Sequence, residues 1–125
     1  MFARARKSYQ STYLETASPA RILDEVFTRL ERDLDDASAL IGVGDLGGKG
    51  AAINHAHALV TELQASLDYA AAPQLCRELH RLYGYVIDCL SRANSEVKQK
   101  PLADALKIVR TLHDGFRTAT AKMAP

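Results

Sequence analysis

Apolar residues recur at intervals of three and four along most of this chain, and strict alternation of apolar and polar positions is nearly absent. Spacing of three and four places apolar side chains on one face of an α-helix, whereas strands show a period of two. Glycine and proline gather between the periodic segments, where they end helices and form turns. The pattern predicts an all-α protein.

Four amphipathic helices are expected, beginning near residues 18, 51, 74 and 101. Ser18 can cap the first helix, with Pro19 as its first residue, and this helix should end where the glycines begin. The second should run to the break at Pro73, and the third to about Ser95. Helices of about twenty residues with short connections predict an antiparallel four-helix bundle.

The chain divides into two parts. Residues 18–125 form a single bundle domain, because 125 residues suit one cooperative core. Residues 1–17 carry few apolar side chains, so they are expected to form a mobile N-terminal arm or short helix lying on the bundle.

The third expected helix has the widest apolar face. Cys76 and Ile87 extend one flank of this face and Tyr85 the other, so it needs more cover than a simple bundle seam provides. Its central stripe consists of Leu75, Leu79, Leu82, Val86 and Leu90.

Charge and cysteine content narrow the class of function. Sixteen basic and fifteen acidic residues give a net charge of +1, which argues against nucleic acid as a partner. No apolar run is long enough for membrane insertion. Cys76 and Cys89, within one expected helix, are about 20 Å apart, too far for a disulfide. Two reduced, buried thiols are typical of a cytoplasmic protein, located in the cytosol.

The stretch GVGDLGGKG, residues 42–50, contains the pattern G-x-G-x-x-G and resembles the end of a P-loop. Such loops bind phosphate where they follow a strand and open a helix. Here a helix precedes the glycines, and Val43 and Gly50 stand where a P-loop needs a glycine and a hydroxyl. We therefore expect a helix connector, and no cofactor.

Histidines suggest a competing signalling function. His55 and His57 lie on the second expected helix, but neither is followed by the lysine and glycine of a phosphotransfer H-x-x-K-G pattern. Their spacing of two also points them apart on a helix, which disfavours a metal site. They are read as solvated surface residues, and His80 and His113 as boundary residues of the bundle. No spacing supports a catalytic set, so no enzyme is expected.

Several segments together resemble the flagellin export chaperone family, FliS. Each motif is weak alone, but their order and spacing are specific, and the resemblance covers nearly the whole chain. The motifs are Tyr9 ten residues before Pro19 of TASP, G-D-x-x-x-K-G at 44–50, E-L-x-x-S-L-D at 62–68, L-Y-x-Y at 82–85 and Ala93-Asn94.

The resemblance implies a non-enzymatic helical bundle that binds the disordered C-terminal segment of flagellin. The bound segment would wrap around the chaperone and fold partly into helices. It would then be unable to polymerise in the cytosol and would be delivered to a component of the flagellar type III export gate. Recognition of this kind lays apolar residues of the partner into a groove.

Two departures from the family pattern affect its binding surface. The family's fourth helix usually closes on a tryptophan, whereas this chain has none and places Phe116 there. The first helix reads Val26-Phe27-Thr28 where the family often has L-Y-D. If that face contacts flagellin, affinity or partner choice would differ.

Candidate site residues follow from the surplus apolar positions. Tyr9 is assigned to arm docking or to the export machinery. The candidate flagellin-binding residues are Ile22, Val26, Tyr83, Tyr85 and Ile87. The alternative interpretation is that these five side chains simply pack in the hydrophobic core. A phosphotransfer bundle and a helical structural protein or homodimer stay open as alternatives.

Overall fold

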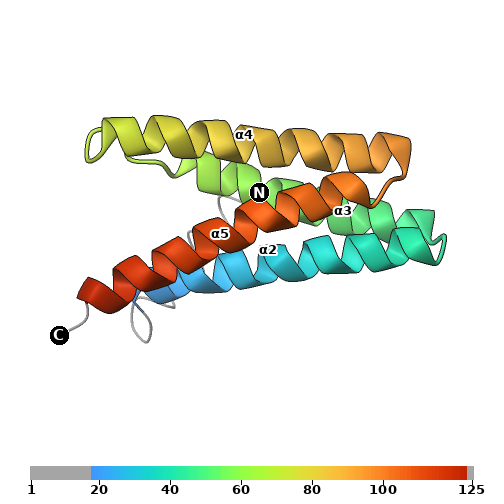
Figure 1. Cartoon of the computed structure of the whole chain (residues 1–125), viewed down its shortest axis with the longest axis horizontal. Helices are drawn as coiled ribbons and strands as arrows, with labels where there is room; N and C mark the ends of the chain where they lie inside the picture. The colour runs from blue at the N-terminus through green and yellow to red at the C-terminus, as the bar shows by residue number, and fades with distance from the viewer. Residues whose placement is uncertain (1–17, 124–125) are drawn as a thin grey trace.

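A computed structural model describes residues 18–123, which form four α-helices (Figure 1). The helices are α2 (Pro19–Gly42), α3 (Leu46–Ala65), α4 (Pro73–Glu96) and α5 (Lys100–Met123). Consecutive helices run antiparallel, and no strand occurs within this part of the chain. The prediction of an all-α antiparallel four-helix bundle is confirmed. The expected arm, residues 1–17, lies outside the described residues.

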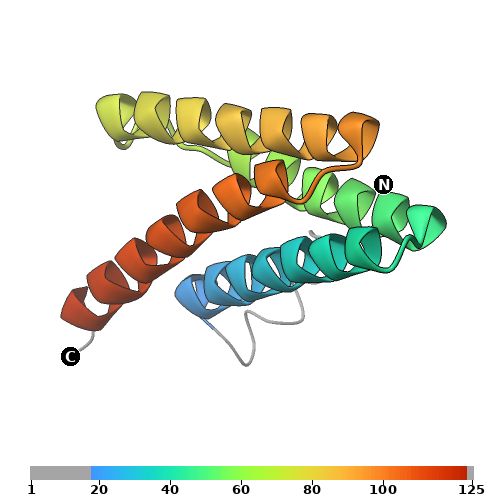
Figure 2. The same ribbon diagram turned by 45° about the vertical axis from the view of Figure 1, so that its right-hand side comes forward.

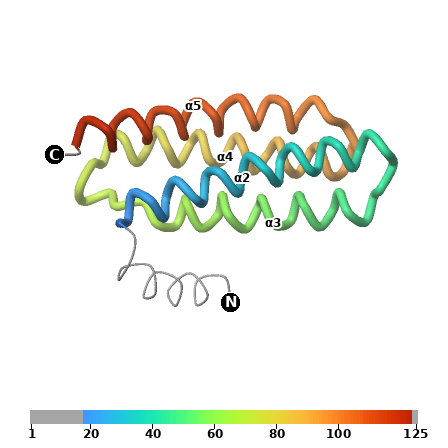
Figure 3. Tube along the Cα trace, turned by 90° about the horizontal axis from the view of Figure 1, so that it is seen from below, coloured from blue at the N-terminus to red at the C-terminus, as the bar shows by residue number. Residues whose placement is uncertain are grey.

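The four helices form a ring in which each helix packs against two neighbours. The packed pairs are α2 with α3, α3 with α4, α4 with α5, and α5 with α2. Figure 3 shows the chain passing up and down through this ring, so that α2 begins and α5 ends at the same end of the bundle. The first and last described helices are therefore packed side by side.

The beginning of α2 is as the sequence predicts. Pro19 is its first residue, and the Ser18 hydroxyl oxygen accepts a hydrogen bond from the Arg21 amide at 3.2 Å. This bond satisfies one of the amides that the first turn of a helix leaves without a partner.

The beginning of α3 corrects the prediction, because the helix starts at Leu46 and not near Ala51. Asp45 caps it by accepting a hydrogen bond from the Gly48 amide at 2.9 Å. Gly44 supplies the left-handed turn before the cap, with φ of +77°. The glycine-rich stretch is therefore a turn followed by the first turn of α3. The same helix ends at Ala65, well before Pro73, and residues 66–72 form a connection.

A charged side chain joins α3 to α4. Lys49 is only 7% exposed, and its Nζ donates to the backbone oxygen of Asn94 at 3.1 Å and to Asn94 Oδ1 at 2.8 Å. The backbone oxygen of Asn94 is one of the last carbonyls of α4, which have no partner within the helix. A cation at a helix C-terminus also interacts favourably with the helix dipole. The lysine of the G-D-x-x-x-K-G motif is thus a structural residue.

The hydrophobic core runs the length of the ring. Phe27, Val86 and Leu90 are fully buried at its centre. On α4 the expected stripe is buried at Leu79, Val86 and Leu90, whereas Leu75 at its beginning is 57% exposed and Cys76 is buried. The Cys76 thiol donates to the backbone oxygen of Asp68 at 3.2 Å, so the connection between α3 and α4 contributes to covering Cys76.

The end of α5 is the least buried part of the bundle. In Figure 2 this helix diverges from α4 toward its C-terminus, while along its length it packs against both α2 and α4. Every residue from 114 to 123 is exposed except Phe116, which is partly buried. The ring of Phe116 contacts that of Phe27 with centroids 5.4 Å apart. The last turns of α5 contact α2 through Phe116 and through Arg117, whose Nε lies 2.6 Å from Asp24 Oδ1.

Candidate partner-binding surface

Three apolar side chains on one side of α4 are incompletely covered. Leu75 is 57% exposed, Tyr85 is 43% exposed and Leu82 is partly buried. Their spacing of seven and three places them on one side of the helix. That side faces α5, because Tyr85 interacts electrostatically with Asp104 and Lys100. We call Leu75, Leu82 and Tyr85 the α4 strip.

Tyr85 is the best placed of the five candidate residues to meet a partner. Contact with the buried Cys89 thiol raises the pKa of Tyr85. The Arg92 guanidinium lies beside the same sulfur, with Nη2 to Sγ at 3.7 Å. The Tyr85 side chain is therefore fixed by its contact with Cys89, while 43% of its surface remains exposed to solvent.

Ile22 and Tyr83 lie in the interior, with exposures of 9% and 3%. Burial raises the pKa of Tyr83 to about 12, because the ionised phenolate would lose its hydration. A partner could reach either side chain only if neighbouring residues moved.

Val26 and Ile87 are partly buried and pack against the core. Residues seven apart lie on the same side of a helix. Asp33, seven residues after Val26, contacts His55 of α3. Asn94, seven residues after Ile87, contacts Lys49 of α3. Both candidates therefore lie on sides of their helices that face α3. The structure does not bring the five candidates into one site, and Tyr9 lies outside the described residues.

The histidines of α3 differ in their surroundings. His55 Nδ1 contacts Asp33 Oδ2 of α2, and its side chain is 40% exposed. His57 is exposed, with its Nδ1 3.5 Å from the Thr61 hydroxyl oxygen. His55 is thus tied to a neighbouring helix, although the sequence suggested a solvated residue.

His113 is also wrongly interpreted from sequence as a boundary residue. It is 4% exposed, with Nε2 2.6 Å from Asp24 Oδ1 and Nδ1 in contact with Glu31 Oε2. Its ring stacks on Phe27, with centroids 5.4 Å apart and an interplanar angle of 18°. The spacing of Asp24, Phe27 and Glu31 puts all three on one face of α2, and this pattern is visible in the sequence.

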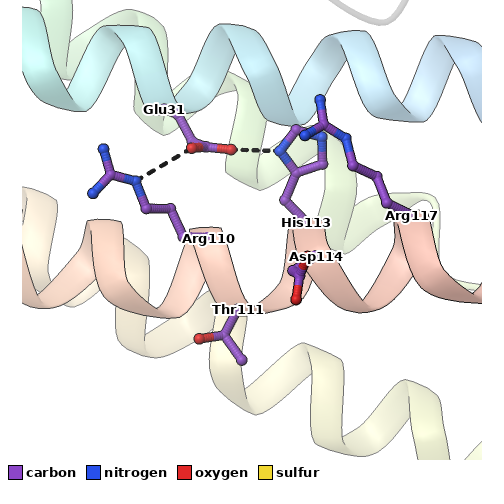
Figure 4. Close-up of a pocket in the computed structure, with 6 residues that line it drawn as sticks. All are labelled: Glu31, Arg110, Thr111, His113, Asp114 and Arg117. Atoms are coloured by element: carbon purple, nitrogen blue, oxygen red, sulfur yellow. Dashed lines mark hydrogen bonds and ion pairs between the residues drawn. The ribbon is translucent and has the colours of Figure 1, made fainter.

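Two hollows open between α2 and α5. The first has a volume of about 460 Å³ and a polar lining (Figure 4), formed by Glu31, Arg110, Thr111, His113, Asp114 and Arg117. The second, of about 390 Å³, lies between the start of α2 and the end of α5 and includes Leu23 and Phe116. Phe116 thus lines an opening at the position where the resemblance expects a larger tryptophan.

Neither a metal site nor a membrane span is found in residues 18–123. No group of three or more acidic, histidine or cysteine side chains could hold a metal ion there. None of the described helices combines the length and the hydrophobicity that crossing a bilayer requires.

Comparison with known proteins agrees with the sequence motifs. The family model described as "Flagellar protein FliS" matches residues 1–123. A solved structure titled "Crystal structure of flagellar chaperone from bacteria" superposes with a TM-score of 0.79 at 16% identity, covering 98% of this chain and 99% of the other. No curated protein matches significantly. The match over nearly the full length establishes that this chain belongs to the flagellar protein FliS family.

Proposed function

We propose that this protein is a flagellar export chaperone that binds the disordered C-terminal segment of flagellin. Binding would prevent premature polymerisation in the cytosol and aid delivery to the flagellar type III export apparatus. The observation that carries the proposal is the match of the FliS family model to residues 1–123. The solved structure with the same fold is itself titled a flagellar chaperone.

The surface of the bundle supports recognition of an apolar, helix-forming segment. The α4 strip presents Leu75, Leu82 and Tyr85 on the side of α4 that faces α5. Half-exposed apolar side chains at helical spacing suit an amphipathic segment that orders on binding. The strip therefore extends the candidate set, with Tyr85 common to both.

The scattered positions of the candidates suit a partner that wraps around the bundle. Val26 and Ile87 lie toward α3, whereas Tyr85 lies toward α5. A single short helix could not cover both sides, but an extended segment of several turns could. In this proposal Ile22 and Tyr83 support the binding faces from the interior, and Tyr9 contacts the export gate component.

Calorimetric titration with the last ~40 residues of the organism's own flagellin tests the proposal. We expect 1:1 binding with a large negative heat-capacity change, the signature of coupled folding over apolar surface. Sedimentation of the same mixture distinguishes a 1:1 complex from a homodimer. A folded protein that binds no flagellin segment would contradict the proposal.

A matched pair of variants localises the surface. Tyr85→Asp and Tyr69→Asp alter two tyrosines that are each 43% exposed, but Tyr69 lies in the connection between α3 and α4. We expect Tyr85→Asp to weaken binding at least tenfold and Tyr69→Asp to leave it nearly unchanged. Ile87→Asp probes the α3 side in the same assay. Equal effects of the two tyrosine variants would remove the α4 strip from the binding surface.

A further inference from the structure

The ring of His113 lies between two carboxylates of α2, and this arrangement constrains its protonation. Nε2 is 2.6 Å from Asp24 Oδ1, and Nδ1 contacts Glu31 Oε2. A neutral imidazole donates from one nitrogen and presents a lone pair on the other, whereas the imidazolium donates from both. Only the protonated ring can therefore satisfy both carboxylates.

The charges around the ring favour the same state. On α2 the acids are Asp24, Glu31 and Asp35. On α5, Arg117 Nε lies 2.6 Å from Asp24 Oδ1, and Arg110 Nε lies 3.4 Å from Glu31 Oε1. Asp114 adds an acid at the first hollow (Figure 4). Arg21 lines the second hollow beside Asp24 and pairs with Glu25, so five acids face three guanidinium groups.

The other helices contribute less to this balance. The titratable groups of α4 that approach α5, Tyr85 and Cys89, interact with Lys100 and Asp104 near the beginning of α5. On α3, His55 contacts Asp33 of α2, on the opposite flank from the His113 contacts. The imidazolium is therefore the cation that completes the α2–α5 cluster.

The cluster lies where α5 has little other attachment. Within residues 114–123 Phe116 is the single side chain that is even partly buried. Segments with few buried contacts open at low free-energy cost. The bonds of Asp24 and Glu31 to α5 thus hold a segment that packing alone holds weakly.

We propose that protonated His113 is a pH-dependent clasp that holds the C-terminal part of α5, residues 114–123, against α2. Loss of its second proton would leave a nitrogen lone pair facing a carboxylate oxygen at hydrogen-bond distance, which is repulsive. The clasp is then closed while both ring nitrogens carry a proton and opens when one of these protons is lost. Opening would free the end of α5 and widen access to the second hollow, lined in part by Leu23 and Phe116.

Nuclear magnetic resonance of the full chain tests both halves of this proposal. Nitrogen shifts of the imidazole, assigned with His113→Gln, report whether one or both ring nitrogens carry a proton. Amide exchange of residues 114–123, corrected for its intrinsic pH dependence, reports opening. We expect both nitrogens to carry a proton wherever residues 114–123 are protected, and protection against exchange that falls at least tenfold as the second proton is lost.

Variants separate the clasp from a purely structural role. In His113→Gln and in Glu31→Gln the protection of residues 114–123 against amide exchange should no longer depend on pH. The overall level of that protection can change. His55→Gln alters another histidine–aspartate contact between helices and should leave that dependence intact. A neutral, single-tautomer His113 in a protein whose residues 114–123 stay protected, or protection that does not change with the protonation state of the ring, would overturn the proposal. These readouts need no flagellin, so they succeed or fail independently of the proposed function.

Discussion

The amine of Lys49 on α3 bonds to both the backbone oxygen and the side-chain oxygen of Asn94 on α4, at 3.1 and 2.8 Å. Replacing Lys49 with methionine keeps an unbranched side chain but leaves both oxygens without this donor. Bonds from a charged donor are worth about 1.5–3 kcal/mol, so we expect a loss of about 2 kcal/mol in the free energy of unfolding.

Urea unfolding of Lys49→Met against the parent protein measures this loss. Lys98→Met is the matched control, because the Lys98 side chain is 66% exposed and pairs with Glu96 on the surface; its effect should be below about 0.5 kcal/mol. Equal free energies of unfolding for the two variants would show that the Lys49 contact does not stabilise the protein.

Val97, the residue after α4, adopts a left-handed conformation with φ of 55°. This conformation costs a residue with a Cβ about 1–2 kcal/mol, and it is rarer still for a β-branched side chain. We expect Val97→Gly to raise the melting temperature and to stabilise the protein by about 1 kcal/mol. Val43→Gly changes another exposed valine, at φ of −98°, and should give no gain. A destabilising Val97→Gly would show that the Val97 side chain contributes more than its conformation costs.

Gly48 and Gly50 should respond oppositely to alanine. A Cβ on Gly48 would lie 2.6 Å from Asp45 Oδ2, whereas a Cβ on Gly50 meets nothing within 4 Å. Because the Asp45 carboxylate is engaged as the N-cap, Gly48→Ala should displace the cap and cost about 1 kcal/mol. Gly50→Ala should stabilise by up to about 1 kcal/mol, since alanine favours helix. Thermal unfolding of both variants decides this, and a gain from Gly48→Ala would show that the cap can shift without cost.

The buried phenol of Tyr83 makes stability fall at alkaline pH. Its pKa is raised to about 12 by burial, above the value near 10 of an unfolded chain. Its contribution is therefore fully present below about pH 10 and declines as the pH rises toward 12, by about 2 kcal/mol at pH 11.5. Unfolding measured from pH 9 to 11.5 should show a shallower decline for Tyr83→Phe than for the parent. Tyr69→Phe should follow the parent curve, and a parent-like slope for Tyr83→Phe would contradict the assignment.

Asp24 should affect stability at the acidic end. The hydrogen bond from Arg117, followed by that from His113, lowers the pKa of Asp24. A lowered pKa in the folded state contributes stability above the unfolded value, and this contribution is lost as the pH falls below about 4. We expect Asp24→Asn to flatten the decline between pH 4 and 2, as measured by chemical unfolding. Asp36→Asn, an exposed change on the same helix, should not flatten it.

The sequence predicted those features that depend on local chemistry. Ser18 and Pro19 identified the start of α2, and apolar spacing identified the four helices. The start of α3 was misplaced because glycine was read as a helix breaker, while the capping carboxylate of Asp45 outweighs that propensity. On α4 the spacing did not distinguish Leu75 from its neighbour Cys76. The structure buries Cys76, whose thiol donates to Asp68 of the connection before α4, and leaves Leu75 57% exposed.

The site was less accessible to sequence analysis. Tyr85 was identified from surplus apolar surface, and the structure leaves it exposed. Tyr83 was a candidate as well, but the structure buries it. Residues two apart point to different sides of a helix, and only the placement of the neighbouring helices determines which of these sides is buried. The position of His113 between two acids depends on the pairing of α2 with α5, which local patterns do not specify.

The ring of helices has a topological consequence. Because α2 begins and α5 ends side by side at one end of the bundle, a short linker from residue 123 to residue 18 would close the chain into a loop without crossing the core. New termini could then be opened in the connection at residues 66–72, which lies at that same end. Such a circular permutant would keep all four helix pairings, because the order in which the chain visits the helices is not what determines their neighbours.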